Sequence, residues 1–190
     1  MLANRTIVAR ARPIFAVVIT VLCNPVAAGA AADSSSLPRV VYLMRHAEKP
    51  AERHDPHLSA AGIARAGKLP GYFPQLLGGQ PLDVIFATGQ SKNSNRPYET
   101  VVPLAGSLHL SIDQSYPNDS YGALAEAVRS RYAGKTVLIS WHHGTIPALA
   151  RALGAVTAPA KWPSASFNMI WKITYDPQGV AKLQQISEPF

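Results

Sequence analysis

Two arginines and three histidines follow strand-like stretches of this sequence, and these residues are the ones that could do chemistry. Arg45-His46 comes directly after the apolar run "VVYLM", and His142-His143 comes directly after "TVLISW". Arg96 follows a third apolar run, "LDVIFA", after a polar loop. Arginine offers planar pairs of N–H donors that match phosphate oxygens, and it keeps its charge. Imidazole can act as a nucleophile or as a general acid–base.

Together, these side chains suit the transfer of a phosphoryl group. Nearby arginines disfavour a protonated imidazole, so His46 should stay neutral and keep a free lone pair. It could then attack phosphorus in line and form a phosphohistidine, which water hydrolyses. Arg45, Arg96 and His143 would hold the equatorial oxygens and supply the charge stabilisation that phosphoryl transfer mainly needs. Taken alone, Arg45-His46 could instead be a strand-end pair that caps backbone carbonyls.

The elements that would position these residues alternate between strands and helices. Continuous apolar runs predict buried strands at 40–44, 82–87 and 136–141. Turn and capping residues predict four helices and three further strands. The helices are 59 to about 70, 96–106, 121–132 and 144–154, and the strands are 107–112, 168–176 and 181–187, the last two as a hairpin.

This alternation predicts a three-layer α/β domain, with a mostly parallel sheet flanked by helices. In such sheets, ligands bind beyond the carboxyl ends of the strands. The three buried strands should therefore bring the arginines and histidines to the same edge of the sheet.

Several segments of the sequence resemble the histidine phosphatase superfamily, which has the phosphoglycerate mutase-like fold. They are, in order, "LMRHAEK", "LSAAGIARA", "SNRPYETVVPLA" and "ISWHHGTIPALARALG". A fifth, "WPSASFNMIWKITYD", resembles the closing strand of a variant group that carries a Trp-Glu-His-x-x-Ile-Pro segment. The similarity runs from about Val40 to about Tyr175. It implies a metal-independent phosphatase that hydrolyses a phosphomonoester or phosphoramidate. A phosphomutase of the same fold and a non-catalytic phospholigand-binding module are the alternatives.

The resemblance also assigns site residues. It makes His46 the phosphorylated nucleophile, and it makes Arg45 and Arg96 the phosphate-binding arginines. His143 becomes the second histidine, because it takes the third place of "WHH". His142 stands where the variant group often has glutamate, so it is either a supporting partner or a residue of the pocket rim.

The general acid is the least defined part of the predicted site. In one branch of the superfamily an acid follows the second histidine, but Gly144 stands there. Another branch draws a carboxylate from a later loop, where Asp119 is the first candidate. Glu48 is the weaker candidate, and water or the substrate itself would suffice for a good leaving group. Ser94 either lines the pocket or caps the helix that starts near Arg96, and we favour the cap.

The first 32 residues have the pattern of a secretory signal peptide. Three arginines precede the apolar stretch "PIFAVVITVLC", and small residues follow in "NPVAAGAAA". Cleavage would leave a linker, 33–38, and a single domain, 39–190, in the periplasm or secreted. An uncleaved anchor is the alternative, although the apolar run is short for a membrane span. We therefore expect no stable membrane insertion after processing.

Charge and composition narrow the expected partners. The net charge is +7, and removal of the leader's three arginines would leave +4, with no run of Lys or Arg that would track nucleic acid. The only cysteine, Cys23, lies in the leader, and no metal-binding motif is present in the sequence. The expected partner is a small phosphorylated substrate or a phosphoprotein. We expect no cofactor, no metal and no nucleic acid. The sequence leaves the oligomeric state open.

Overall fold

A six-stranded sheet with the order β3-β2-β4-β1-β5-β6 lies at the centre of the fold. The computed structural model describes residues 36–52 and 54–190, so the predicted leader and residues 33–35 of the predicted linker lie outside the described residues. The first four strands of that order are parallel, whereas β5 and β6 are antiparallel to their neighbours. The predicted fold class is therefore confirmed. The strands are β1 (Val40–Arg45), β2 (Val84–Ala87), β3 (Ile112–Asp113), β4 (Thr136–Trp141), β5 (Met169–Tyr175) and β6 (Ala181–Ser187).

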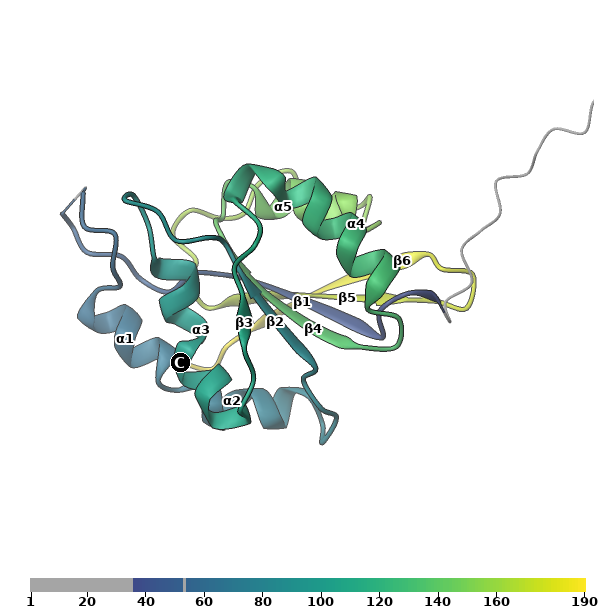
Figure 1. The fold of residues 1–190 in the computed structure, drawn as a ribbon, viewed down its shortest axis with the longest axis horizontal. Helices are drawn as coiled ribbons and strands as arrows, with labels where there is room; N and C mark the ends of the chain where they lie inside the picture. The colour runs from purple at the N-terminus through teal and green to yellow at the C-terminus, as the bar shows by residue number, and fades with distance from the viewer. Residues whose placement is uncertain (1–35, 53) are drawn as a thin grey trace, which may run out of the picture. The chain divides into compact units, whose positions relative to one another are not determined.

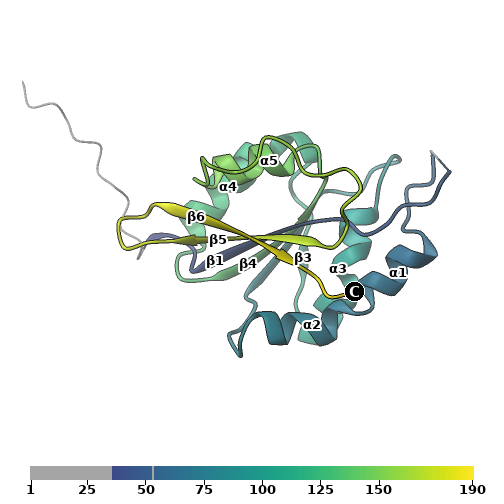
Figure 2. The ribbon, with the colours of Figure 1, turned by 180° about the vertical axis from the view of Figure 1, so that it is seen from behind.

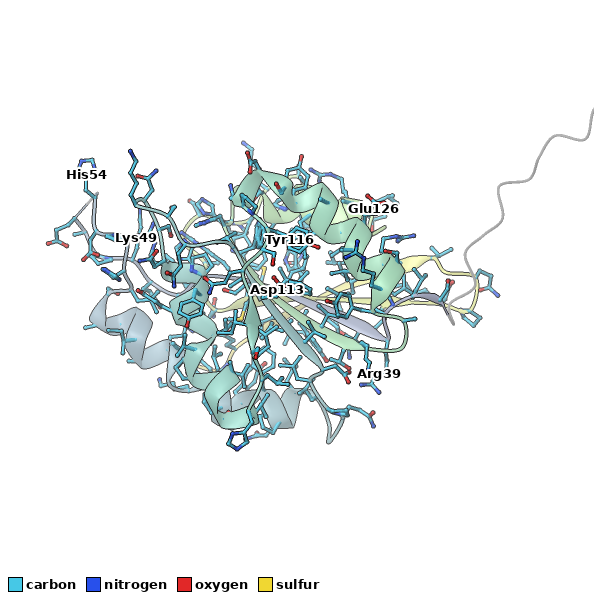
Figure 3. The ribbon with its side chains drawn as sticks, viewed as in Figure 1. Arg39, Lys49, His54, Asp113, Tyr116 and Glu126 are labelled. Carbon is cyan, nitrogen blue, oxygen red and sulfur yellow. The ribbon has the colours of Figure 1, made fainter. Side chains whose placement is uncertain are left out.

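Helices cover both faces of this sheet, as Figures 1 and 2 show from opposite sides. One face carries α4 (Tyr121–Arg131), preceded by the short turn η2 (Asn118–Ser120), and α5 (Ile146–Ala152). The other face carries α1 (Ala60–Ala66), α2 (Leu69–Leu76) and α3 (Arg96–Leu108). Figure 3 shows Arg39 at the start of β1 and Lys49 beyond its other end, where the chain leaves the sheet.

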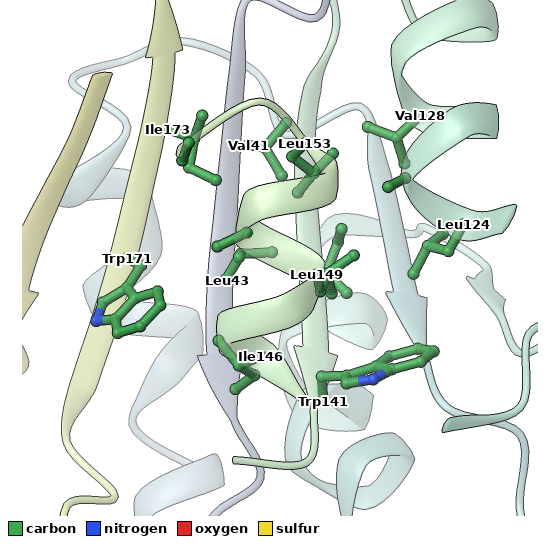
Figure 4. Packing of buried hydrophobic residues seen from close by; sticks show 14 of the residues in the cluster. Val41, Leu43, Leu124, Val128, Trp141, Ile146, Leu149, Leu153, Trp171 and Ile173 are labelled. Atoms are coloured by element: carbon green, nitrogen blue, oxygen red, sulfur yellow. The ribbon is translucent and has the colours of Figure 1, made fainter. Parts of the chain in front are cut away.

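The central strand β1 explains why the sequence needs an unbroken apolar run. Val41 and Leu43 pack on the α5 side, together with Leu149 (Figure 4), and they are fully buried. Tyr42 and Met44 pack on the opposite side, against the α2 and α3 cluster. Both faces of β1 are covered by helices. If apolar and polar residues alternated along this strand, the polar side chains would be buried in one of the two cores. Burial of each apolar side chain contributes about 1.5–3 kcal/mol relative to exposure, so the strand is held firmly up to Arg45.

The segment after Ser59 forms two helices instead of the predicted one. Ser59 is the N-cap of α1, as predicted, and its Oγ accepts a hydrogen bond of 3.1 Å from the Gly62 N–H. The predicted helix end near Pro70-Gly71 is wrong, because α1 ends at Ala66 and α2 begins at Leu69. Pro70 lies in the first turn of α2, where its missing N–H costs nothing.

The predicted strand at 107–112 is also wrong over most of its length. Helix α3 continues to Leu108, and His109 ends it in the left-handed region, with φ 54°. Leu104 and Leu108 both pack on the cluster under α3, at a helical spacing of four residues. This burial outweighs the alternating pattern of "SLHLSI", and only Ile112–Asp113 pairs as β3.

Gly62 lets α1 approach the backbone that follows the first strand. The Ser59 N–H donates to the Glu48 carbonyl at 2.9 Å, and a Cβ on Gly62 would lie 2.4 Å from that same oxygen. We expect Gly62→Ala to push α1 away, with about 1–3 kcal/mol lost from the free energy of unfolding. Chemical denaturation measures this loss.

Gly71→Ala is the matched control for this prediction. Gly71 lies in α2, and a Cβ there would meet no atom within 4 Å. Because alanine is favoured over glycine in a helix, this variant should be neutral or up to about 1 kcal/mol more stable. Equal stability of the two variants would contradict the close approach of α1.

Candidate active site

The carboxyl ends of three parallel strands bring the candidate residues to one edge of the sheet. Arg45 at the end of β1 lies opposite Trp141 at the end of β4. Ala87, which ends β2, lies opposite Ser140. The residues directly beyond these three ends are His46, His142 and Thr88, and the rings of His46 and His142 lie 5.5 Å apart between centroids. The structure thus brings together side chains that are widely separated in the sequence.

His46 is only 4% exposed and is held in one tautomer. Its Nδ1 lies 2.7 Å from the carbonyl oxygen of Ala47. Because a carbonyl oxygen can only accept, Nδ1 carries the hydrogen and Nε2 carries the lone pair. Burial is the main cause that lowers the pKa of His46, to about 3. The hydrogen bond to Ala47 acts in the opposite direction and raises this pKa. The ring of His142 and the charges of Arg45 and Arg96 lower it further. His46 is therefore a neutral imidazole with a nucleophilic nitrogen.

Arg45 is buried and held by the segment before β5. Its Nη1 donates to the carbonyl oxygens of Ser164, at 2.5 Å, and Ser166, at 3.4 Å. Its guanidinium lies over the ring of Phe167, 3.8 Å from the centroid. Burial lowers the pKa of Arg45 to about 10, so the group remains charged at neutral pH. Its Nε is buried and has no hydrogen-bond partner among the described residues.

Arg96 begins α3 and provides a second cation at the site. Its Nη1 donates to the Asp55 carbonyl at 2.6 Å, and its charge lowers the pKa values of His46 and His142. Like that of Arg45, its Nε is buried without a partner within the described part of the chain. Buried donors normally find an acceptor. Neither Nε is open to solvent, but the positive charge of both guanidinium groups acts on the His46 imidazole, so this edge of the sheet favours an anion.

Thr100 connects α3 to the backbone after His46. Its Oγ1 accepts a hydrogen bond of 2.9 Å from the Ala47 N–H and donates one of 2.7 Å to the Arg96 carbonyl. One turn of helix separates Arg96 from Thr100, so a single side chain fixes the position of α3 relative to residue 47. This contact explains the spacing of arginine and threonine in "RPYET".

Of the adjacent histidines, His142 is the one that contacts His46. Its Nε2 lies 3.4 Å from the hydroxyl of Thr88. Burial lowers its pKa to about 4, and the charges of Arg96, His143 and Arg45 act in the same direction. Our prediction gave phosphate contact to His143 and left the role of His142 open. The strand register explains why His142 lies against His46, because His142 is the first residue past β4 just as His46 is the first past β1.

The two candidate acids lie in different surroundings. Both carboxylate oxygens of Glu48 accept from Arg65, at 2.8–3.0 Å. Burial alone raises the pKa of Glu48, but the hydrogen bonds and charge of Arg65 give a net lowering, which disfavours proton donation. Asp119 is exposed in η2, and no hydrogen bond or salt bridge joins it to the site within the described residues. The neighbouring Asn118 accepts from the Thr145 hydroxyl at 2.7 Å, so this turn borders the loop after β4.

Ser94 does not cap α3. The residue before the helix is Asn95, and no side chain makes a capping hydrogen bond there, so the predicted cap is wrong. Ser94 is 6% exposed, and its hydroxyl is buried without a partner among the described residues.

Two residues near the candidate site, Thr88 and Phe167, were not predicted from the sequence. Thr88 could have been found as the first residue past "LDVIFA", whereas no local signal connects Phe167 to Arg45, more than a hundred residues away.

Within residues 36–52 and 54–190, no group of three or more His, Cys, Asp or Glu side chains is placed to hold a metal ion. Nor does this part of the chain contain a helix that is long and apolar enough to cross a membrane.

The buried neutral histidine predicts a loss of stability in acid. The imidazole pKa is about 6.5 in the unfolded chain and about 3 for folded His46. The unfolded state therefore takes up the proton first, and stability falls as the pH drops below about 6.5. At pH 5 this one group should cost about 2 kcal/mol, measurable by urea unfolding at pH 7.5 and pH 5. His46→Asn should lose about 2 kcal/mol less over the same interval, and an identical pH dependence in both proteins would contradict the prediction.

Comparison with known proteins finds similarity at the level of structure. No protein-family model and no curated protein matches this chain. A candidate phosphohistidine phosphatase, SixA from Nakamurella multipartitia, superposes with a TM-score of 0.53 and 20% identity, over 80% of this chain and 97% of its own.

Two further solved structures are similar over nearly the same region. The mycobacterial glucosyl-3-phosphoglycerate phosphatase, in complex with inorganic phosphate, has a TM-score of 0.55 and 17% identity, over 80% of this chain and 97% of its own. Phosphoglycerate mutase from Bacillus anthracis has a TM-score of 0.51 and 14% identity, over 82% and 95%. The resemblance to the histidine phosphatase superfamily is thus confirmed for the fold: this chain has the phosphoglycerate mutase-like fold.

Proposed function

We propose that this chain is a metal-independent phosphatase that hydrolyses a phosphomonoester or phosphoramidate through a phosphohistidine on His46. One observation carries the proposal: a buried, neutral imidazole with its Nε2 lone pair free lies where the charges of two arginines, Arg45 and Arg96, act on it. A neutral nucleophile and fixed positive charge are what phosphoryl transfer needs.

The reaction divides into two displacements at phosphorus. In the first, the Nε2 lone pair of His46 attacks, the P–N bond forms, and the bond to the leaving oxygen breaks. The leaving oxygen takes its proton from water or from the substrate's own acidic group. The Nδ1–H bond to Ala47 stabilises the positive charge on the phosphorylated ring. In the second, water attacks phosphorus, the P–N bond breaks, and the water proton passes to solvent as inorganic phosphate leaves.

The guanidinium groups would hold the phosphoryl oxygens during both displacements. Arg45 and Arg96 are charged and fixed by backbone carbonyls, so they need little rearrangement as charge develops. The geometry favours His142 as the second imidazole at the oxygens, in place of His143. The phosphatases with this fold, one of them solved with inorganic phosphate, support this proposal.

Hydrolysis of 4-nitrophenyl phosphate in the presence of a chelator tests the proposed function. We expect turnover that the chelator does not reduce, and a rapidly quenched reaction should contain acid-labile, alkali-stable phosphate on His46. Transfer of the phosphoryl group to an added alcohol in preference to water would favour a phosphomutase. A chelator-sensitive activity that survives His46→Asn would overturn the proposal.

A further inference from the structure

A cavity of about 410 Å³ opens next to the candidate active site. Its lining consists of His143 and Gly144 after β4, Pro147 of α5, and residues 160–164 before β5. Cavities of about 300–1,000 Å³ are typical of small-molecule sites. The cavity is therefore large enough for the organic part of a small substrate.

The cavity shares a wall with the site that surrounds His46. Ser164 lines it, and the Ser164 carbonyl is the acceptor that holds Arg45. His143 lines it and directly follows His142, which contacts His46. A phosphoryl group bound at Arg45 would thus lie beside this cavity.

Residues 160–164, which form one wall of the cavity, are anchored in the core. Trp162 is 3% exposed, and its ring lies 4.9 Å from that of Trp171 between centroids. Its Nε1 donates to the Ser166 carbonyl at 3.1 Å. The same carbonyl accepts from Arg45, so the cavity wall and the phosphate-binding arginine are held by one segment. A wall fixed in this way can select its ligand by shape and charge.

The charges around the cavity are positive. Lys161 lies on its wall and is exposed, and no salt bridge pairs it with a carboxylate in the described part of the chain. Lys49, on the loop after β1, lies close enough to His143 to lower the pKa of that imidazole, after the larger effects of burial and Arg45. None of the lining residues is acidic, and several are apolar, including Pro147, Trp162 and Pro163. This chemistry suits a compact group with an apolar body and a negative charge.

We propose that this cavity is a leaving-group subsite, and that Lys161 selects a phosphomonoester whose organic part carries a second negative charge. The inference rests on the proposed function and names the class of substrate for it. The negative group can be a carboxylate or another anion of similar size, because a lysine ammonium recognises charge without a fixed geometry.

A matched pair of substrates tests the subsite. 3-Carboxyphenyl phosphate and its methyl ester differ in one negative charge but have similar leaving groups. We expect the wild-type protein to prefer the carboxylate in kcat/KM by about fivefold, the upper range for a partly exposed ion pair. Lys161→Ala should remove this preference and Lys161→Glu should reverse it, with little change for the methyl ester in Lys161→Ala. Added salt should weaken the preference.

A control lysine and a size variant sharpen the test. Lys182→Ala changes an exposed lysine of β6, paired in the sheet with Thr174 at the far end from the site, and should keep the wild-type preference. Ala160→Phe should narrow the cavity and raise KM for both esters severalfold, while inhibition by inorganic phosphate stays unchanged.

The outcomes separate this inference from the proposed function. A wild-type preference near one, or a preference that Lys161→Ala leaves intact, overturns the subsite while phosphatase activity stands. If neither ester and no 4-nitrophenyl phosphate is hydrolysed, the proposed function fails, and the dissociation constants of the two esters, measured by calorimetry, then decide the subsite. The subsite is supported if 3-carboxyphenyl phosphate binds more tightly than its methyl ester and Lys161→Ala removes the difference. Equal binding of the two compounds overturns the subsite.

Discussion

His46→Asn should reduce turnover of 4-nitrophenyl phosphate by more than about a thousandfold, as expected when a nucleophile is removed. Asparagine fills much of the same space but has no ring nitrogen that can attack phosphorus. The arginines remain in place, since their partners are the backbone carbonyls of Ser164 and Asp55 and not His46 itself. Binding of inorganic phosphate, measured by calorimetry, should therefore change by only a few-fold.

The contrast between turnover and binding separates a catalytic role from a structural one. His109→Asn is the matched control, because His109 is exposed and ends α3 in the left-handed region, which asparagine tolerates. This control should keep full activity. If His46→Asn retained substantial turnover, or lost phosphate binding and folded structure together, His46 would not be the nucleophile.

Arg96→Ala should lower kcat/KM by about 10²–10³-fold, the range found when one charge-stabilising donor is removed. The loss arises because the guanidinium supplies positive charge beside the nucleophile, and this charge already acts on the imidazoles of His46 and His142. Arg96→Lys should recover only part of the loss, since an ammonium group cannot offer two fixed donors to one phosphoryl group. The dissociation constant of inorganic phosphate should rise in both variants, most in Arg96→Ala.

Arg131→Ala is the control for this series, because Arg131 is exposed at the end of α4 and precedes the start of β4, whereas His142 follows the opposite end of that strand. Equal phosphate binding by the Arg96→Ala variant and the control would contradict a phosphate-binding role for Arg96. Full recovery of activity in Arg96→Lys would indicate that charge alone matters at this position.

The sequence by itself determined the layered fold and the sheet edge at which the candidate residues gather. An unbroken apolar run such as 40–44 is stable only where both faces of a strand are covered, which predicts a central strand between two helical layers. The edge at which the candidate residues meet followed from the order of the strands and from the polar residues after each of them. These features are local, since each depends on one segment and on the general behaviour of parallel sheets.

The tertiary structure decided which of the neighbouring polar groups lie against His46 and Arg45 at the candidate site. His142 and not His143 lies against His46, because the register between β1 and β4 fixes which residue leaves the sheet first. The Glu48 carboxylate is held by Arg65, which also pairs with Glu188 near the other end of the chain. Arg45 is fixed by Ser164, Ser166 and Phe167. These contacts join segments that are far apart in sequence, and only the packing of the whole domain brings them within reach of one another.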